Sequence, residues 1–275
     1  FLIKDSEDAL SREELPIGVF DSGMGGLTVL KELCQRLPDE DFIYLGDTAR
    51  LPYGTKSPQT VHKYSMQAAD KLMQMKVKAL VIACNTAASF SLGKLSTAYY
   101  PTPVYGVIEP GAEKACERVD ASGILVLATE GTVSGGAYQR SILNKNPEAP
   151  VYARACPLWV TLAEQRQQDD HITRSLIEYY LQGFIGKGPS TVLLGCTHFP
   201  LFTAFIREML GEGCRVVDSA VTTANHVASE LELKGLLNSN GGEISFMATD
   251  GLGRFSRIGE QFLNTKIVNV SEVDL

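Results

Sequence analysis

The chain has 275 residues, enough for two domains of ordinary size or for one large α/β unit. Apolar residues make up 44% and charged residues 21%, a composition that excludes a disordered or fibrous protein. The formal net charge of -7 argues against nucleic acid as a partner, because binding to a phosphate backbone needs a basic surface.

The sequence predicts neither a membrane segment nor a metal centre. No apolar run approaches the roughly 18 residues that cross a bilayer, and the stretch 1–16 turns acidic early, unlike a signal peptide or an anchor. The six cysteines show no CxxC or CxxH spacing, which predicts reduced thiols and a cytoplasmic location. Two of them, Cys34 and Cys116, fall within helical patterns and are expected to be small buried side chains.

Eight short apolar runs divide the chain into an alternation of strands and helices. An unbroken apolar run is typical of a strand that is covered on both faces. The runs predict strands at 17–20, 42–46, 79–84, 103–108, 123–129, 191–196, 215–218 and 244–249. Amphipathic segments such as 57–76 and 168–186 predict helices, and Ser57 followed by Pro58 predicts where the first of these begins. The alternation predicts an α/β fold with mostly parallel sheets flanked by helices.

Two parts of the chain resemble each other. The sequence "IGVFDSGMGG" at 17–26 is similar to "ILVLATEGTVSGG" at 124–136, and "VIACNT" at 81–86 is similar to "LLGCTH" at 193–198. Both pairs agree in order and offset, which favours two copies of one α/β unit over a chance likeness between buried strands. We therefore expect two similar domains, related by a pseudo-twofold axis, with the active site between them.

Cys84 and Cys196 each stand at the carboxyl end of a predicted strand. Ligands bind at this edge of a parallel sheet, and the helix that follows brings its positive N-terminus near the thiol, which favours the thiolate. An inert buried cysteine is the alternative for either residue taken alone. Two thiols across a cleft permit a specific reaction, because one removes a proton from carbon while the other returns one to the opposite face. His198 is placed to assist Cys196.

Polar residues also follow the first two predicted strands. Asp21 and Ser22 end the first, while Asp47 and the "PYG" of 52–54 follow the second. Helix capping is the alternative role of both aspartates. The glycines of "DSGMGG" fail the GxGxxG pattern, because Thr28 stands where the last glycine is needed, and the chain has no GKS or GKT. The sequence therefore predicts no bound nucleotide cofactor.

A family resemblance is carried by seven motifs in chain order. They are "IGVFDSGMGGLTV", "YLGDTARLPYG", "VIACNTAAS", "GVIEPG", "CPLWVTLAE", "LLGCTHFPL" and "VVDS", and together they resemble the signatures of the glutamate racemase family, within the aspartate and glutamate racemase superfamily. The resemblance implies cofactor-independent interconversion of L- and D-glutamate, which supplies D-glutamate for peptidoglycan. It also implies a homodimer without a membrane partner and, in some relatives, a muramyl-nucleotide activator. The first domain would comprise 1–108 plus 219–275, and the second 109–218.

The same resemblance implies roles for individual residues. Cys84 and Cys196 would be the two catalytic bases, and Asp21, Glu164 and His198 would tune or orient the thiols, with Asp47 a weaker candidate. Substrate contacts are implied for Asp21, Ser22, Pro52, Tyr53, Gly54, Asn85, Thr86, Thr129, Thr197 and His198. No metal ligand is implied.

The chemistry of these residues suits glutamate. Arg50 is the only cation in the motifs, so neutral donors would hold the two carboxylates, which leaves Asp21 for the ammonium group. No lysine stands at these strand ends, which disfavours a pyridoxal cofactor. Trp159 and Thr161 depart from the family pattern and bear on the shape of the pocket.

Two alternatives stay open. The first is an aspartate racemase or a related isomerase of the superfamily; His198 in "CTH" favours glutamate, because aspartate racemases resemble "CTE" at this point. The second is a non-catalytic protein that binds a small molecule on the same scaffold. If loss of Cys84 or Cys196 left turnover unchanged, this alternative or a one-base, decarboxylase-like reaction would remain.

Overall fold

The computed structural model describes residues 11–165, 170–186 and 188–275. The sequence-based expectation for the stretch 1–16 therefore lies mostly outside the described residues, and so does the start of the helix predicted at 168–186. No described helix is both long and apolar enough to cross a bilayer.

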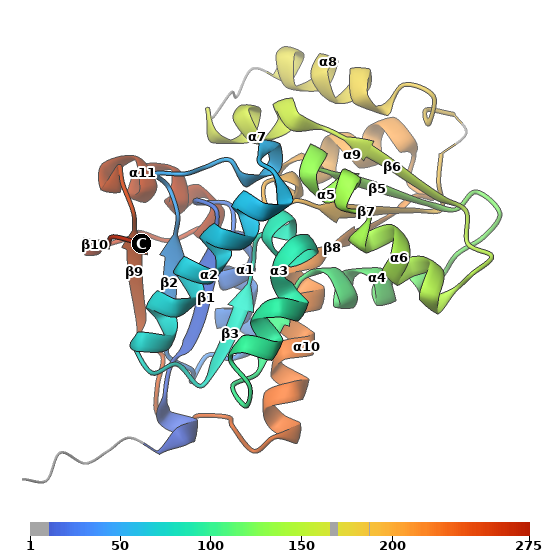
Figure 1. Ribbon diagram of the computed structural model, residues 1–275. Coiled ribbons are helices and arrows are strands. Elements are labelled where there is room, and N and C mark those ends of the chain that lie inside the picture. Colours follow the sequence, from blue (N-terminus) through green and yellow to red (C-terminus); the bar gives the residue numbers. More distant parts are fainter. Residues whose placement is uncertain (1–10, 166–169, 187) are drawn as a thin grey trace, which may run out of the picture.

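The strands form two parallel sheets (Figure 1). The six-stranded sheet has the order β10 (Val270–Glu272), β9 (Ile244–Ala248), β2 (Phe42–Gly46), β1 (Ile17–Asp21), β3 (Ala79–Ile82) and β4 (Val104–Gly106). The four-stranded sheet has the order β6 (Val151–Ala155), β5 (Ile124–Ala128), β7 (Thr191–Gly195) and β8 (Arg215–Asp218). Every strand pair is parallel. The prediction of an α/β fold with mostly parallel sheets is confirmed.

Helices connect and cover these strands. The α-helices are α1 (Leu27–Arg36), α2 (Pro58–Gln74), α3 (Asn85–Ala98), α4 (Ile108–Cys116), α5 (Glu130–Gly135), α6 (Ala137–Lys145), α7 (Pro157–Glu164), α8 (Asp170–Leu181), α9 (Thr203–Leu210), α10 (Ser219–Leu233) and α11 (Leu252–Leu263). Short 3-10 helices are η1 (Arg12–Glu14), η2 (Tyr53–Thr55) and η3 (Phe199–Phe202). As predicted, α2 begins after Ser57, whose hydroxyl accepts from the Thr60 N–H and so satisfies one free donor of the first turn.

All eight predicted strands are present, and two further strands, β6 and β10, were missed. Both lie at sheet edges, where one side of a strand has no neighbour. The residues of β6 alternate between partly buried and exposed, so this strand lacks the unbroken apolar run on which the prediction rested. Cys34 and Cys116 are also more exposed than expected, since each lies only partly covered at the side of its helix.

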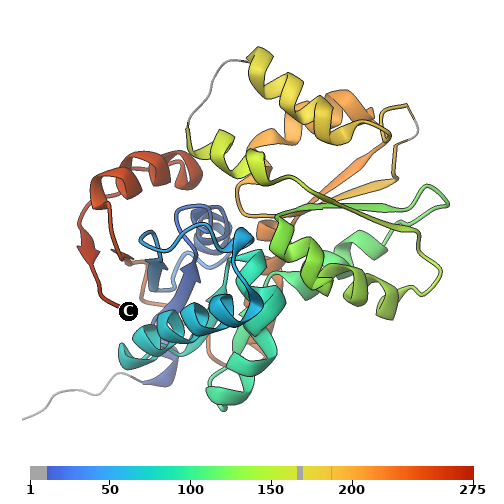
Figure 2. The ribbon, with the colours of Figure 1, turned by 45° about the horizontal axis from the view of Figure 1, so that its top comes forward.

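The two sheets repeat one topology. Strands β2, β1, β3 and β4 lie in the same order as β6, β5, β7 and β8, and Figure 2 shows the two sheets in neighbouring halves of the molecule. Cys84 follows β3 and Cys196 follows β7, so the two cysteines occupy equivalent places on different sheets. Strands β9 and β10 have no counterpart in the four-stranded sheet. The domain boundaries at 108 and 218 stay a prediction; α10, which starts at Ser219, packs against both α1 and α4.

Candidate active site

A small cavity of about 30 Å³ lies where the carboxyl ends of strands from both sheets meet. Its lining consists of Ser22, Pro52, Tyr53, Gly54, Cys84, Asn85, Thr86, Thr129, Val160, Cys196, Thr197 and His198. The structure therefore brings together every predicted substrate contact except Asp21. Both thiols reach this one cavity, from opposite sheets.

Cys84 caps α3 and is held there by its neighbours. Its Sγ accepts from the Ala87 N–H at 3.4 Å, and its thiol donates to Ser22 Oγ at 3.7 Å. Burial, together with the Asp21 carboxylate, raises the pKa of Cys84 to about 12, although the Ala87 N–H acts in the opposite direction. The helix N-terminus favours the thiolate as expected, but desolvation outweighs this effect.

Cys196 has a different partner. The segment after it is the 3-10 helix η3, which leads directly into α9, so the expected helix follows this cysteine as well. In addition, His198 places its Nδ1 3.8 Å from the Cys196 Sγ. Burial opposes the charged imidazole, but the hydrogen bonds to Cys196 and Glu164 prevail and raise the pKa of His198 to about 10. At neutral pH a protonated imidazole therefore faces the sulfur of Cys196.

Glu164, at the end of α7, orients the imidazole from its other side. Its Oε1 lies 3.1 Å from His198 Nε2, and its Oε2 accepts from Arg254 Nη2 at 3.0 Å. Burial raises the pKa of Glu164, but His198 and Arg254 outweigh burial and lower it overall. Sequence reasoning missed Arg254, because it lies on α11, outside the motifs that carry the family resemblance.

Asp21 is fully buried and does not line the cavity. Its Oδ2 accepts from the Gly23 N–H at 3.0 Å, while its Oδ1 has no hydrogen-bond partner among the described residues. Burial raises the pKa of Asp21 against the opposing effect of His198. Asp21 acts on Cys84 through its charge, and its contact with an ammonium group stays a prediction.

Asp47 and Arg50 support the wall of the cavity and do not line it. The Asp47 Oδ2 accepts from Arg50 Nε at 2.7 Å and from the Tyr53 hydroxyl at 2.5 Å, and its Oδ1 accepts from the Thr249 hydroxyl at 3.0 Å. Arg50 also donates to Gln67 at 2.7 Å. The weaker prediction that Asp47 tunes a thiol is not supported by these contacts, because Asp47 instead holds the segment that carries Tyr53.

Neutral donors line the remaining walls. The Tyr138 hydroxyl donates to Asn85 Oδ1 at 2.6 Å, which leaves the Asn85 Nδ2 without a partner among the described residues. The hydroxyls of Thr86, Thr129 and Thr132 lie 2.9 to 3.2 Å from one another. Sequence reasoning did not select Tyr138, Thr132 or Val160. Of these three residues, only Thr132 could have been found from the sequence, because it lies one helical turn after Thr129 and so shares its face of the helix.

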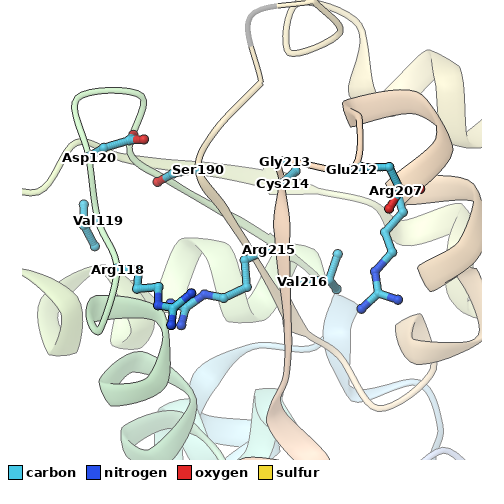
Figure 3. Close-up of a pocket in the computed structure, with 10 residues that line it drawn as sticks. All are labelled: Arg118, Val119, Asp120, Ser190, Arg207, Glu212, Gly213, Cys214, Arg215 and Val216. Carbon is cyan, nitrogen blue, oxygen red and sulfur yellow. The ribbon is translucent and has the colours of Figure 1, made fainter.

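A larger cavity lies at the opposite, amino end of the four-stranded sheet (Figure 3). It measures about 610 Å³, and Arg118, Arg207 and Arg215 extend into it. None of the predicted catalytic or substrate-binding residues lines this cavity. Size therefore does not identify the candidate active site, because the predicted reactive residues line the smaller cavity. In the described part of the chain, no three His, Cys, Asp or Glu residues are grouped to hold a metal ion.

Comparison with known proteins agrees with this arrangement. Residues 18–227 match the model of the family described as Asp/Glu/Hydantoin racemase. The chain is 46% identical to the glutamate racemase of Geobacter metallireducens, over 94% of this chain and 96% of that protein. Among solved structures, glutamate racemase isoform RacE1 from Bacillus anthracis superposes with a TM-score of 0.92 at 36% identity, covering 96% of this chain and 98% of that one.

A second structure was solved with a ligand. Glutamate racemase from Francisella tularensis, in complex with D-glutamate, has a TM-score of 0.89 at 36% identity and covers 95% of this chain and 98% of that chain. With two equivalent thiols on one cavity and these likenesses along nearly its full length, the chain belongs to the Asp/Glu/Hydantoin racemase family.

Proposed function

We propose that the protein interconverts L- and D-glutamate without a cofactor, with Cys84 and Cys196 as the two bases. One observation carries the proposal: the two thiols follow equivalent strands of different sheets and line the same cavity. The likeness to glutamate racemases supports glutamate as the substrate.

The two thiols have different neighbours. Cys84, with a pKa of about 12, carries its proton at neutral pH, whereas Cys196 lies 3.8 Å from a protonated His198. In one direction the Cys196 thiolate takes the Cα proton, and the Cys84 thiol then gives its proton to the opposite face of the carbanion. This exchange leaves a thiol at Cys196 and a thiolate at Cys84. The reverse reaction, or proton exchange with solvent, restores the first state.

Neutral hydrogen-bond donors are proposed to hold the carboxylates of the substrate. Asn85, whose Nδ2 has no partner among the described residues, lines the cavity together with Ser22, Thr86 and Thr197, while Arg50 is occupied by Asp47. Donors aimed at the α-carboxylate also stabilise the negative charge that spreads onto it when the Cα proton leaves.

The cavity must enlarge to admit the substrate. A volume of about 30 Å³ holds on the order of one water molecule and is far too small for an amino acid. Because the lining comes from both sheets, separation of the two halves is the simplest motion that opens it. Closure around glutamate would then exclude water from the thiols.

Incubation with L-glutamate or L-aspartate in deuterated water tests the proposal. We expect loss of optical rotation and deuterium at the α-carbon with L-glutamate, because the returning thiol proton exchanges with solvent. Cys84→Ser and Cys196→Ser should each lower turnover by about 1,000-fold or more, with Cys34→Ser as the matched control at full activity. Label appearing only in aspartate would assign the aspartate racemase alternative, and full turnover without either thiol would exclude the two-base mechanism.

Four further features stay predictions: the supply of D-glutamate to peptidoglycan, the cytoplasmic location, the homodimer and the muramyl-nucleotide activator. Turnover with and without a muramyl-nucleotide precursor, and sedimentation of the purified chain, test the activator and the dimer directly. A turnover rate that does not change when the precursor is added would show that the precursor does not activate this protein.

A further inference from the structure

The Cys196 side of the cavity contacts a helix that lies outside the repeated unit. Helix α11 connects β9 to β10, the two strands without counterpart in the four-stranded sheet. In Figures 1 and 2 this helix, in red, lies at the edge of the six-stranded half that faces α7. It therefore lies where the two halves of the molecule meet.

Two side chains of α11 contact the Cys196 arm, by which we mean Cys196, His198 and Glu164. Phe262 packs against the His198 ring edge to face, with the ring centroids 5.2 Å apart. Arg254 donates through Nη2 to Glu164 Oε2 at 3.0 Å. One helix thus contacts the imidazole directly and also binds the carboxylate that orients it.

We propose that Arg254 is a positioning residue for racemisation, which holds Glu164 against His198 when the two halves of the molecule close. The proposal rests on the proposed function of the same site. Glu164 belongs to the four-stranded half and Arg254 to the six-stranded half, so their ion pair spans the cleft. Opening of the cleft to admit glutamate would separate them. Closure restores the pair, and the occupied Oε2 then keeps Oε1 directed at His198 Nε2.

The contact is suited to a reversible role. The Arg254 side chain is 42% exposed, whereas that of Glu164 is 8% exposed. A pair at such a boundary contributes little to the stability of the fold, because water screens it, but it can still fix the geometry of a carboxylate. The Cys84 side has no equivalent: its thiol contacts Ser22 and the Ala87 N–H, and no histidine lies between it and an acid in the described structure. This difference between the two sides fits the proposed role of α11 in positioning the Cys196 arm.

Replacement of Arg254 tests the proposal. We expect Arg254→Met to lower kcat about fivefold, which corresponds to about 1 kcal/mol, with a smaller change in KM. Arg254→Lys should recover part of the rate, because lysine keeps the charge but not the planar pair of donors. The matched control is Arg257→Met, an exposed arginine on the same helix, which should behave like the wild type.

The pH profile separates positioning from a purely structural effect. Among the described residues, the charged groups that face Glu164 are His198 and Arg254, and both lower its pKa. Without Arg254 the pKa of Glu164 rises, so Glu164 gains a proton at a higher pH, and the acid limb of kcat/KM moves to higher pH. Equal profiles for Arg254→Met and Arg257→Met would overturn the proposal.

A double variant and a substrate-free measurement complete the test. If Arg254 acts through Glu164, Arg254→Met should add nothing to the loss caused by Glu164→Gln; full additivity would overturn the proposal. In protein without substrate, the His198 Nε2 proton should exchange with solvent faster in Arg254→Met than in Arg257→Met, as followed by NMR. This readout does not depend on turnover. A wild-type chain that fails to racemise glutamate would refute the proposed function, while the exchange rates would still decide the role of Arg254.

Discussion

At the residue scale, the two thiols have equivalent positions but different surroundings. Burial raises the pKa of Cys84 to about 12, together with the charge of the nearby Asp21. Cys196 lies beside His198, a group of opposite charge. The repeat therefore supplies a symmetric framework, and different residues in each copy give the two sulfurs charged neighbours of opposite sign.

His198 makes the stability of the fold depend on pH. Its pKa is raised from the ordinary 6.5 to about 10, so its favourable contribution is complete below about 6.5 and is lost as the pH rises through about 10. We expect the free energy of unfolding to fall across this interval, as measured by urea denaturation. His198→Asn should flatten this part of the curve, with His62→Asn as the control, because His62 is partly buried away from the cavity and its pKa is lowered instead. An unchanged slope in His198→Asn would contradict the assignment.

At the element scale, the segment between β2 and α2 is held by one carboxylate. Asp47 accepts hydrogen bonds from Arg50, Tyr53 and Thr249, and Thr249 follows β9, far away in the sequence. These bonds place Tyr53 and Gly54 on the wall of the cavity. A buried carboxylate with three donors is a rigid support, because the three hydrogen bonds fix its position. They also offset part of the cost of burying its charge.

Asp47→Asn should weaken substrate binding more than it slows the chemical step. An amide cannot replace the charge, so the wall segment loses part of its support; we expect KM to rise about tenfold and kcat to change less. Steady-state kinetics measure both. Asp70→Asn is a suitable control, since exposed Asp70 also accepts from a tyrosine hydroxyl, that of Tyr99 at 2.7 Å, away from the cavity. A fall in kcat with unchanged KM would instead favour a direct effect on a thiol.

At the scale of the whole molecule, the two halves close tightly around the site. A Cβ placed on Gly54 would lie 2.7 Å from the Thr129 Cβ, and these two residues belong to opposite halves. Only glycine permits this approach, because any larger side chain would hold the halves apart.

Gly54→Ala should therefore leave the protein folded but unable to close. We expect kcat to fall about 10- to 100-fold, because small displacements of reacting groups are costly. The control is Gly93→Ala on α3, where an added Cβ meets no atom within 4 Å and the helix should gain up to about 1 kcal/mol of stability. Turnover and thermal unfolding separate the two effects. Full activity of Gly54→Ala would show that closure tolerates a wider gap.

The sequence by itself determined the alternation of buried strands and helices and the positions of both cysteines. Unbroken apolar runs identify strands that helices cover on both faces, which is why these eight strands could be predicted from the sequence. The edge strand β6 escaped the prediction because its residues alternate in burial. Cys84, Cys196 and most of the lining are local features, since each follows directly after a strand.

Only the tertiary structure decided the charges and the closure of the site. The contact of Arg254 with Glu164, and that of Asp47 with Thr249, join residues far apart in the chain, which no local pattern reveals. The same holds for the thiols: the predicted helix N-terminus favours the thiolate, whereas burial and Asp21 raise the pKa of Cys84 to about 12. Desolvation and long-range pairing depend on which residues meet in space, and chain order does not specify this.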